Sequence, residues 1–127
     1  MKVIVRNSSG TPIYEQICEQ IRQAILNDEL AEGDLLPSIR QLAADVKVSV
    51  ITTTRAYTEL EQAGYIVTVP GKGCYVAAKD SDLIKEQLLR QIEAGFEAAI
   101  AAARIAKLPR LELHQLFDFT LERSDYE

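Results

Sequence analysis

Three positively charged residues stand at positions where a protein can contact nucleic-acid phosphates. Arg40 and Arg55 lie in short segments with helical hydrophobic patterns, and Lys72 lies between two glycines in a turn flanked by β-rich runs. Glycines on both sides of Lys72 would let the backbone approach a phosphate without a Cβ clash. Cationic side chains neutralise phosphates, and an arginine can also bind a guanine edge. These residues predict a nucleic-acid-binding surface.

The sequence lacks the residue patterns of catalytic, metal or cofactor sites. It shows no nucleophile with an adjacent base, no acid/base pair and no phosphate-binding glycine loop, and His114 is the only histidine. Cys18 and Cys74 have no metal-ligand spacing, so both are expected to be buried, reduced thiols, with redox sensing as the alternative. We therefore expect no enzyme activity, no metal and no cofactor.

The helix that carries Arg55 is expected to begin with Ser49 as N-cap and to end before Gly64. At 100° per residue, its inward face comprises Thr53, Ala56, Tyr57 and Leu60. Ile51, Thr54 and Arg55 then project outward. An exposed Ile51 beside an arginine suits a DNA groove, where it can pack on a thymine methyl group, although an incidental exposed isoleucine is the alternative.

Two helices are expected before this one. The first has Thr11 as N-cap and Pro12 as its first residue, and its apolar face repeats every four residues. That face comprises Ile13, Ile17, Ile21 and Ile25. The second helix begins at Ser38, which should form a capping box with Gln41. With β-rich runs at 65–69 and 74–77, the order is that of a winged helix-turn-helix, mainly α with a small β-hairpin wing.

Two amphipathic helices are expected in the C-terminal part of the chain. The first should start at Asp80-Ser81-Asp82, and Leu108-Pro109 separates it from a last helix over residues 110–123. Two helices cannot bury all of their apolar residues against each other, so we predict an intersubunit bundle in a homodimer, with a cofactor or effector pocket between the helices as the alternative. The residues expected at this interface are Ile84, Leu88, Ile92, Phe96, Ala99, Ile100, Leu113, Leu116 and Phe117.

Acidic and basic residues are distributed unevenly along the chain. The 127 residues have a net charge of −5, whereas residues 38–79 alone carry five basic and three acidic side chains, a net charge of +2. Only this segment is positive, and its excess is small, so useful DNA affinity should require two copies. The sequence has neither an apolar run long enough to cross a membrane nor a signal peptide, so a cytoplasmic protein is expected.

The order of motifs resembles the DNA-binding domain of GntR-family bacterial transcription regulators. The matching motifs, with x for positions that do not count, are PIYxQI at 12–17, LPSxRxLA at 36–43, VS at 48–49, RAYxxLExxGYI at 55–66 and GKGxYV at 71–76. The short two-helix tail resembles the YtrA-like subfamily, because the larger effector domains of other branches would not fit. The resemblance implies a winged helix-turn-helix domain at 1–78 and a helical dimerisation domain, which could also hold an effector, at 79–127.

The resemblance implies a sequence-specific transcriptional regulator, most simply a homodimeric repressor of an inverted-repeat operator. The DNA contacts that it implies are Arg40, Ser49, Val50, Ile51, Thr52, Thr54, Arg55, Gly71, Lys72 and Gly73. Val50 and Ile51 depart from residues frequent in the family, so base specificity does not carry over. Thr53 replaces a usual core valine, which should either weaken packing slightly or add a hydroxyl bond to the preceding turn. The alternative is a winged-helix protein-interaction module without specific DNA binding.

Overall fold

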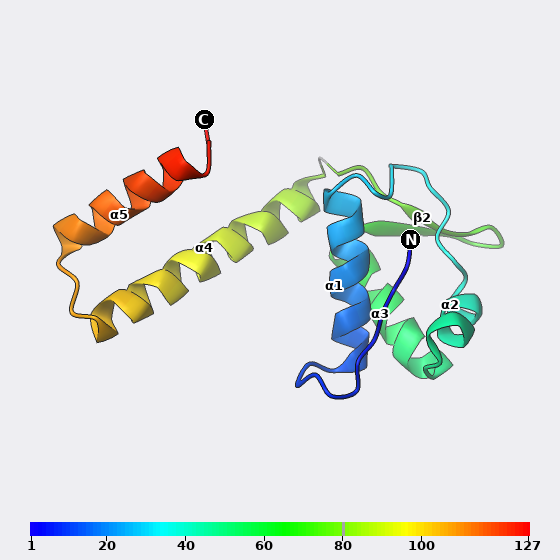
Figure 1. The fold of residues 1–127 in the computed structure, drawn as a ribbon. Helices are drawn as coiled ribbons and strands as arrows, with labels where there is room; N and C mark the ends of the chain where they lie inside the picture. The colour runs from blue at the N-terminus through cyan, green and yellow to red at the C-terminus, as the bar shows by residue number, and fades with distance from the viewer. Residues whose placement is uncertain (80) are drawn as a thin grey trace. The chain divides into compact units, whose positions relative to one another are not determined.

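The computed structural model describes residues 1–79 and 81–127, in which five helices and one β-hairpin are formed (Figure 1). In chain order they are α1 (Ile13–Leu26), α2 (Ile39–Val46), α3 (Val50–Gln62), β1 (Ile66–Val69), β2 (Gly73–Val76), α4 (Asp82–Ile105) and α5 (Arg110–Arg123). The predicted fold class, mainly α with a small β wing, is confirmed. The expected role of Asp80 at the start of α4 lies outside the described residues.

Serine side chains cap α2 and α3 as predicted. Ser38 Oγ accepts a hydrogen bond from the Gln41 amide at 3.1 Å, and Ser49 Oγ accepts one from the Thr52 amide at 3.1 Å. The second half of the predicted capping box does not form. Gln41 Nε2 instead donates to the Asp45 carboxylate at 2.7 Å, because a charged acceptor one turn along the helix forms the stronger bond.

The expected Thr11 cap of α1 is wrong. Pro12 occupies the N-cap position with ψ of 147°, so helical backbone begins one residue later, at Ile13. The Thr11 amide donates to Ser9 Oγ at 3.1 Å, within the loop before the helix. No side chain caps this end of α1.

Two glutamines of α1 hold the N-terminal arm in place. Gln20 exchanges two hydrogen bonds with the backbone of Ile4, at 2.8 and 2.5 Å. Gln16 exchanges two with the backbone of Arg6, at 2.8 and 2.9 Å. Each glutamine side chain thus pairs with the backbone as a neighbouring strand would. These bonds satisfy the backbone N–H and C=O groups of Ile4 and of Arg6.

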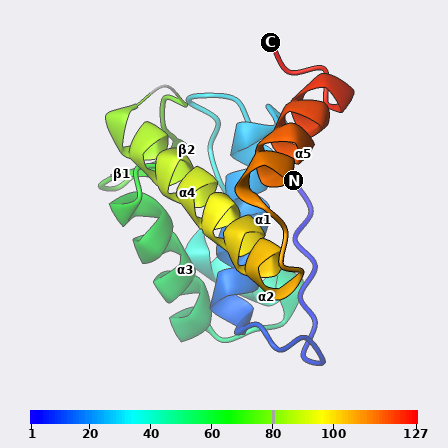
Figure 2. The same ribbon diagram turned by 90° about the vertical axis from the view of Figure 1, so that its left-hand side faces the viewer.

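The core of the N-terminal part lies between α1 and α3, which run side by side in both views (Figures 1 and 2). Its buried residues include Ile17, Ile21, Ile25, Thr53, Ala56, Tyr57 and Leu60. These residues confirm the inward faces predicted for both helices, except that Ile13 is only half-buried. Thr53 Oγ1 donates to the Ser49 carbonyl at 3.3 Å, which is the second of the two outcomes expected for this residue, and the Tyr57 hydroxyl donates to the Pro37 carbonyl at 2.7 Å.

The wing has a short third segment beside β2. β1 and β2 pair in antiparallel register, and Leu35 forms an isolated bridge with Tyr75 on the other side of β2. The Leu36 amide donates to the Cys74 carbonyl at 2.9 Å. The chain before α2 is therefore fixed to the hairpin.

The chain divides into two compact units, Met1–Gln87 and Leu88–Glu127, so the first turns of α4 belong to the first unit. The division falls after the expected boundary at 78/79. Ile84 is fully buried, and Leu83 lies against Gly64 at the end of α3. The side chain of Ile84 is therefore unavailable to a second subunit.

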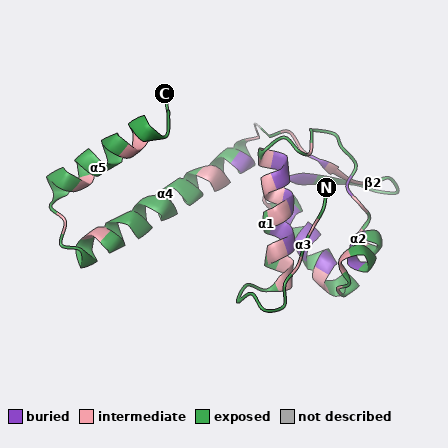
Figure 3. Cartoon of the chain, viewed as in Figure 1, coloured by how far each residue is buried: buried purple, intermediate pink, exposed green. Residues whose placement is uncertain are grey.

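The second unit has no buried side chain among residues 88–127, and its helices are largely exposed in Figure 3. α5 runs back alongside α4, and Phe96 meets Phe117 edge to face at 5.8 Å. None of the helices that the structure describes is sufficiently long and apolar to span a membrane. Large apolar side chains of this unit, among them Phe96 and Phe117, are exposed in the single chain.

Cys18 is buried as predicted, whereas Cys74 is only half-buried because its strand is at the surface. The Cys18 thiol donates to the Ala56 carbonyl at 3.3 Å, and burial raises the pKa of the Cys18 thiol to about 11.

The raised pKa of Cys18 predicts a loss of stability at alkaline pH. An unfolded cysteine ionises near its ordinary pKa of 9.0, so stability should fall as pH rises from 9 towards about 11. Between neutral pH and about pH 10, the free energy of unfolding of Cys18→Ala should therefore fall by about 1 kcal/mol less than that of the original protein. Urea unfolding of both proteins at neutral and alkaline pH measures this. If the free energy of unfolding falls by the same amount with rising pH in both proteins, the burial of the Cys18 thiol is contradicted.

Candidate nucleic-acid interface

The turn between α2 and α3 exposes the first turn of α3. Lys47 closes α2 in the left-handed conformation, with φ of 59°, and Ser49 begins α3 two residues later. Ile51 follows with 82% of its surface exposed, and Val50 is also exposed. The predicted outward face of α3 therefore presents two apolar side chains at the helix N-terminus.

The hydroxyl groups near this end of α3 form local hydrogen bonds. Ser49 Oγ and Thr52 Oγ1 lie 2.8 Å apart, and Thr54 Oγ1 donates to the Val50 carbonyl at 2.8 Å. Oxygen atoms of these groups can still accept hydrogen bonds. The Thr54 hydroxyl and one of the Ser49 and Thr52 hydroxyls are thus engaged as donors in the free protein.

Arg55 is held by residues on two helices. Its guanidinium carbon lies 3.7 Å from the centre of the Tyr14 ring of α1, and its Nε lies 3.5 Å from the Glu59 carboxylate. The side chain of Arg55 remains 60% exposed, so other N–H groups can reach a phosphate. This role of Tyr14 was not predicted from the sequence, because an aromatic residue on a distant helix gives no local signal.

Removing the Tyr14 ring should weaken DNA binding moderately. Tyr14→Leu removes the cation–π interaction that orders Arg55, and the Kd for DNA should rise about 2- to 5-fold. Tyr14→Phe retains the ring and should bind like the original protein. Fluorescence polarisation with labelled duplex DNA compares them. Equal weakening in both variants would show that the hydroxyl, and not the ring, is responsible.

The wing tip is a tight turn that requires both of its glycines. Gly71 and Gly73 have φ of +78° and +118°, values that residues with a side chain rarely adopt. The Lys72 amide donates to the Val69 carbonyl at 2.9 Å, which leaves the exposed Lys72 side chain at the tip. A Cβ at Gly73 would lie 3.1 Å from Leu35.

Arg40 is exposed on the first turn of α2. Neither Arg40 nor Lys72 forms an ion pair within residues 1–79 and 81–127. The wing tip and the α2–α3 turn project towards the same side of the first unit in Figure 1. The first unit therefore carries exposed cationic side chains on α2 and on the wing as well as the exposed end of α3.

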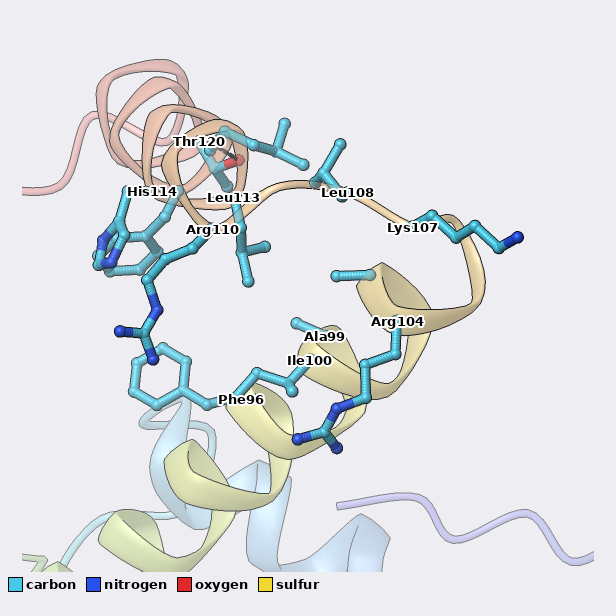
Figure 4. A pocket seen from close by; sticks show the side chains of 13 residues that line it. Phe96, Ala99, Ile100, Arg104, Lys107, Leu108, Arg110, Leu113, His114 and Thr120 are labelled. Carbon is cyan, nitrogen blue, oxygen red and sulfur yellow. Dashed lines mark hydrogen bonds between the residues drawn. The ribbon is translucent and has the colours of Figure 1, made fainter.

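The second unit contains a groove of about 790 Å³ between α4 and α5 (Figure 4). Six of the expected interface residues line it, namely Phe96, Ala99, Ile100, Leu113, Leu116 and Phe117. Leu88 and Ile92 do not, and Ile84 belongs to the first unit. Arg104, Lys107, Arg110 and His114 also line the groove. Within the described ranges, no cluster of His, Cys, Asp or Glu could hold a metal ion.

Comparison with known proteins places this arrangement in a family. The model of "Bacterial regulatory proteins, gntR family" matches residues 13–76, from the start of α1 to the end of β2. The HTH-type transcriptional repressor YtrA of Bacillus subtilis is 35% identical over 107 residues, which are 84% of this chain and 82% of YtrA.

Solved structures are similar as well. A transcriptional regulator from Oenococcus oeni superposes with a TM-score of 0.76 at 26% identity, covering 92% of this chain and 97% of its own. The AraR DNA-binding domain in complex with operator ORE1 covers 61% of this chain and 94% of its own, with a TM-score of 0.52 and 25% identity. The family match spans the described winged helix-turn-helix, and the chain belongs to the gntR family of bacterial regulatory proteins.

Proposed function

We propose that this protein is a homodimeric transcriptional regulator that binds operator DNA sequence-specifically and acts as a repressor. The observation that carries the proposal is the exposed end of α3, which presents Ile51 and Arg55 in a winged helix-turn-helix whose wing tip carries an exposed Lys72. A repressor role is supported by the related YtrA, and operator binding by the related AraR domain.

In the proposed DNA surface, charged side chains bind the phosphates and uncharged side chains lie nearest the bases. Arg40, Arg55 and Lys72 contact phosphates, while Ile51, Thr52 and Thr54 lie nearest the base edges. Gly71 and Gly73 let the wing backbone approach the duplex, and Ser49 and Val50 complete the exposed helix end. The DNA-binding domain comprises residues 1–78, and the helical domain from residue 79 joins two copies.

Homodimer formation would account for the apolar groove of the second unit. Exposed Phe96 and Phe117 leave a contiguous apolar surface that water does not favour. Two copies also present two positive DNA-binding segments, which compensates for the small charge excess of each. With two-fold symmetry, the half-sites of an inverted repeat would lie about 34 Å apart.

Removal of the side chains proposed to bind phosphates should weaken DNA binding and reduce its dependence on salt. Arg40→Ala and Lys72→Ala should each raise the Kd for DNA from upstream of the protein's own gene about 10-fold. Each should also lower the log–log salt slope by roughly 0.9 for every phosphate in the complex that the variant no longer neutralises. Polarisation titrations over a range of salt concentrations measure both quantities.

Lys85→Ala is the matched control, since it removes the same charge from an exposed residue of α4 outside the proposed interface. It should leave both quantities nearly unchanged. If Arg40→Ala and Lys72→Ala behave like Lys85→Ala, the assignment of these residues to DNA is wrong.

A further inference from the structure

The end of α3 that is proposed to face DNA carries branched apolar side chains. Val50 and Ile51 occupy its first turn and are both exposed, Ile51 by 82%. At 100° per residue, Ile51 lies at the centre of the outward face, with Thr54 on one side and Arg55 on the other. The centre of this face is therefore apolar.

The charged side chains nearest to Ile51 along the chain come before and after the first turn of α3. Lys47 lies in the turn between α2 and α3, and Arg55 lies one helical turn after Ile51, where α1 and Glu59 hold it. Residues 48–54, VSVITTT, contain no amide, guanidinium, ammonium or carboxylate side chain. The groups that bind guanine or adenine edges with paired hydrogen bonds are therefore absent from this stretch of sequence.

The polar side chains at this end of α3 are hydroxyls, which discriminate weakly between bases. Thr54 Oγ1 donates to the Val50 carbonyl at 2.8 Å, and Ser49 Oγ and Thr52 Oγ1 lie 2.8 Å apart. A hydroxyl can donate to thymine O4 or accept from cytosine N4, so it can pair with either base. The C5-methyl group of thymine also projects into the major groove, and ordinary cytosine lacks it. An apolar side chain distinguishes bases by this methyl group.

We propose that α3 recognises the C5-methyl group of a pyrimidine in each half-site, whether the base is thymine or 5-methylcytosine, an inference that rests on the proposed binding of operator DNA. Ile51 packs on the methyl group, with Val50 beside it. Because the neighbouring hydroxyls can pair with thymine O4 or with cytosine N4, the protein accepts both methylated bases at this position. It rejects unmethylated cytosine, which leaves Ile51 without its contact. Binding to such a site therefore depends on cytosine methylation.

Replacement of thymine by deoxyuridine tests the methyl contact, because deoxyuridine pairs with adenine like thymine but lacks the C5-methyl group. The probe is the tightest-binding duplex selected from a random library, with its thymines replaced one position at a time. At the contact position, the Kd should rise about 4-fold in one half-site and about 15-fold in both, since each half-site loses the burial of one methyl group. Fluorescence polarisation measures the Kd.

Ile51→Ala determines whether Ile51 makes the methyl contact. This variant should bind the thymine and deoxyuridine duplexes with nearly equal Kd, because its shortened side chain no longer covers the methyl group. If deoxyuridine acted by changing the shape of the duplex, the difference would persist in Ile51→Ala. Ile105→Ala is the matched control, since it removes the same atoms from an isoleucine of α4 that is 85% exposed and lies outside the first unit. It should retain the difference of about 15-fold.

Cytosine and 5-methylcytosine at the contact position separate recognition of the methyl group from recognition of the base pair. Cytosine should weaken binding, and 5-methylcytosine in both half-sites should restore it by about 15-fold relative to cytosine. Equal Kd values for these two bases would overturn the proposal. So would a scan in which no deoxyuridine weakens binding, or a loss that persists in Ile51→Ala. A random library from which no sequence is enriched would instead refute the sequence-specific DNA binding of the proposed function.

Discussion

Gly64→Ala should lower the free energy of unfolding by about 2–4 kcal/mol, a large part of the stability of a domain of this size. Gly64 follows α3 with φ of +86°, a conformation that costs a residue with a side chain about 1–2 kcal/mol. A Cβ there would also lie 2.7 Å from the Leu83 Cβ, so α4 would have to shift. Urea unfolding followed by circular dichroism measures the change.

Gly33 is a matched control for the packing of Leu83. Its φ is +85°, nearly that of Gly64, but a Cβ at Gly33 would meet no atom within 4 Å. Gly33→Ala should therefore cost only the conformational part, about 1–2 kcal/mol. If the two variants are equally destabilised, the close packing of Leu83 on Gly64 does not contribute to stability.

Phe96→Ala should raise the dimer Kd by at least about 100-fold, because a symmetric interface loses the ring twice. Phe96 lines the groove, contacts Phe117 edge to face, and is about half exposed in the single chain. Its burial would therefore come from the second copy. Sedimentation equilibrium across a range of concentrations gives the Kd.

Leu111→Ala provides the comparison for Phe96→Ala. Leu111 is more exposed than Phe96 and does not line the groove, so its truncation should change self-association little. A dimer that is weakened equally by both substitutions would place the interface outside the groove.

The local elements of this protein were predictable from the sequence because their signals are local. Ser49 caps the helix that follows it, and Gly64 adopts the left-handed conformation just after α3. Pro109 immediately precedes α5, whose observed range is the predicted one. The inward face of α3 followed from helical periodicity alone, since Thr53, Ala56, Tyr57 and Leu60 are all buried.

Contacts between distant residues were not predictable in the same way. The ring of Tyr14 beneath Arg55 and the glutamine bonds to the N-terminal arm join residues on different segments. Ile84 continues the apolar repeat of α4, so periodicity alone could not separate its burial in the first unit from the exposed groove residues. Thr11 has the chemistry of a helix cap, but the extended backbone of Pro12 displaced the helix start.

Selection of binding sites from a library of random DNA duplexes tests the central claim most directly. A homodimer that reads DNA with two copies of α3 should enrich an inverted repeat with half-site centres about 10 base pairs apart. The enriched duplex should bind at least about 1,000-fold tighter than a shuffled duplex at physiological salt. If no sequence is enriched, and all duplexes bind with the same weak, salt-sensitive affinity, the protein is not a sequence-specific regulator of this kind.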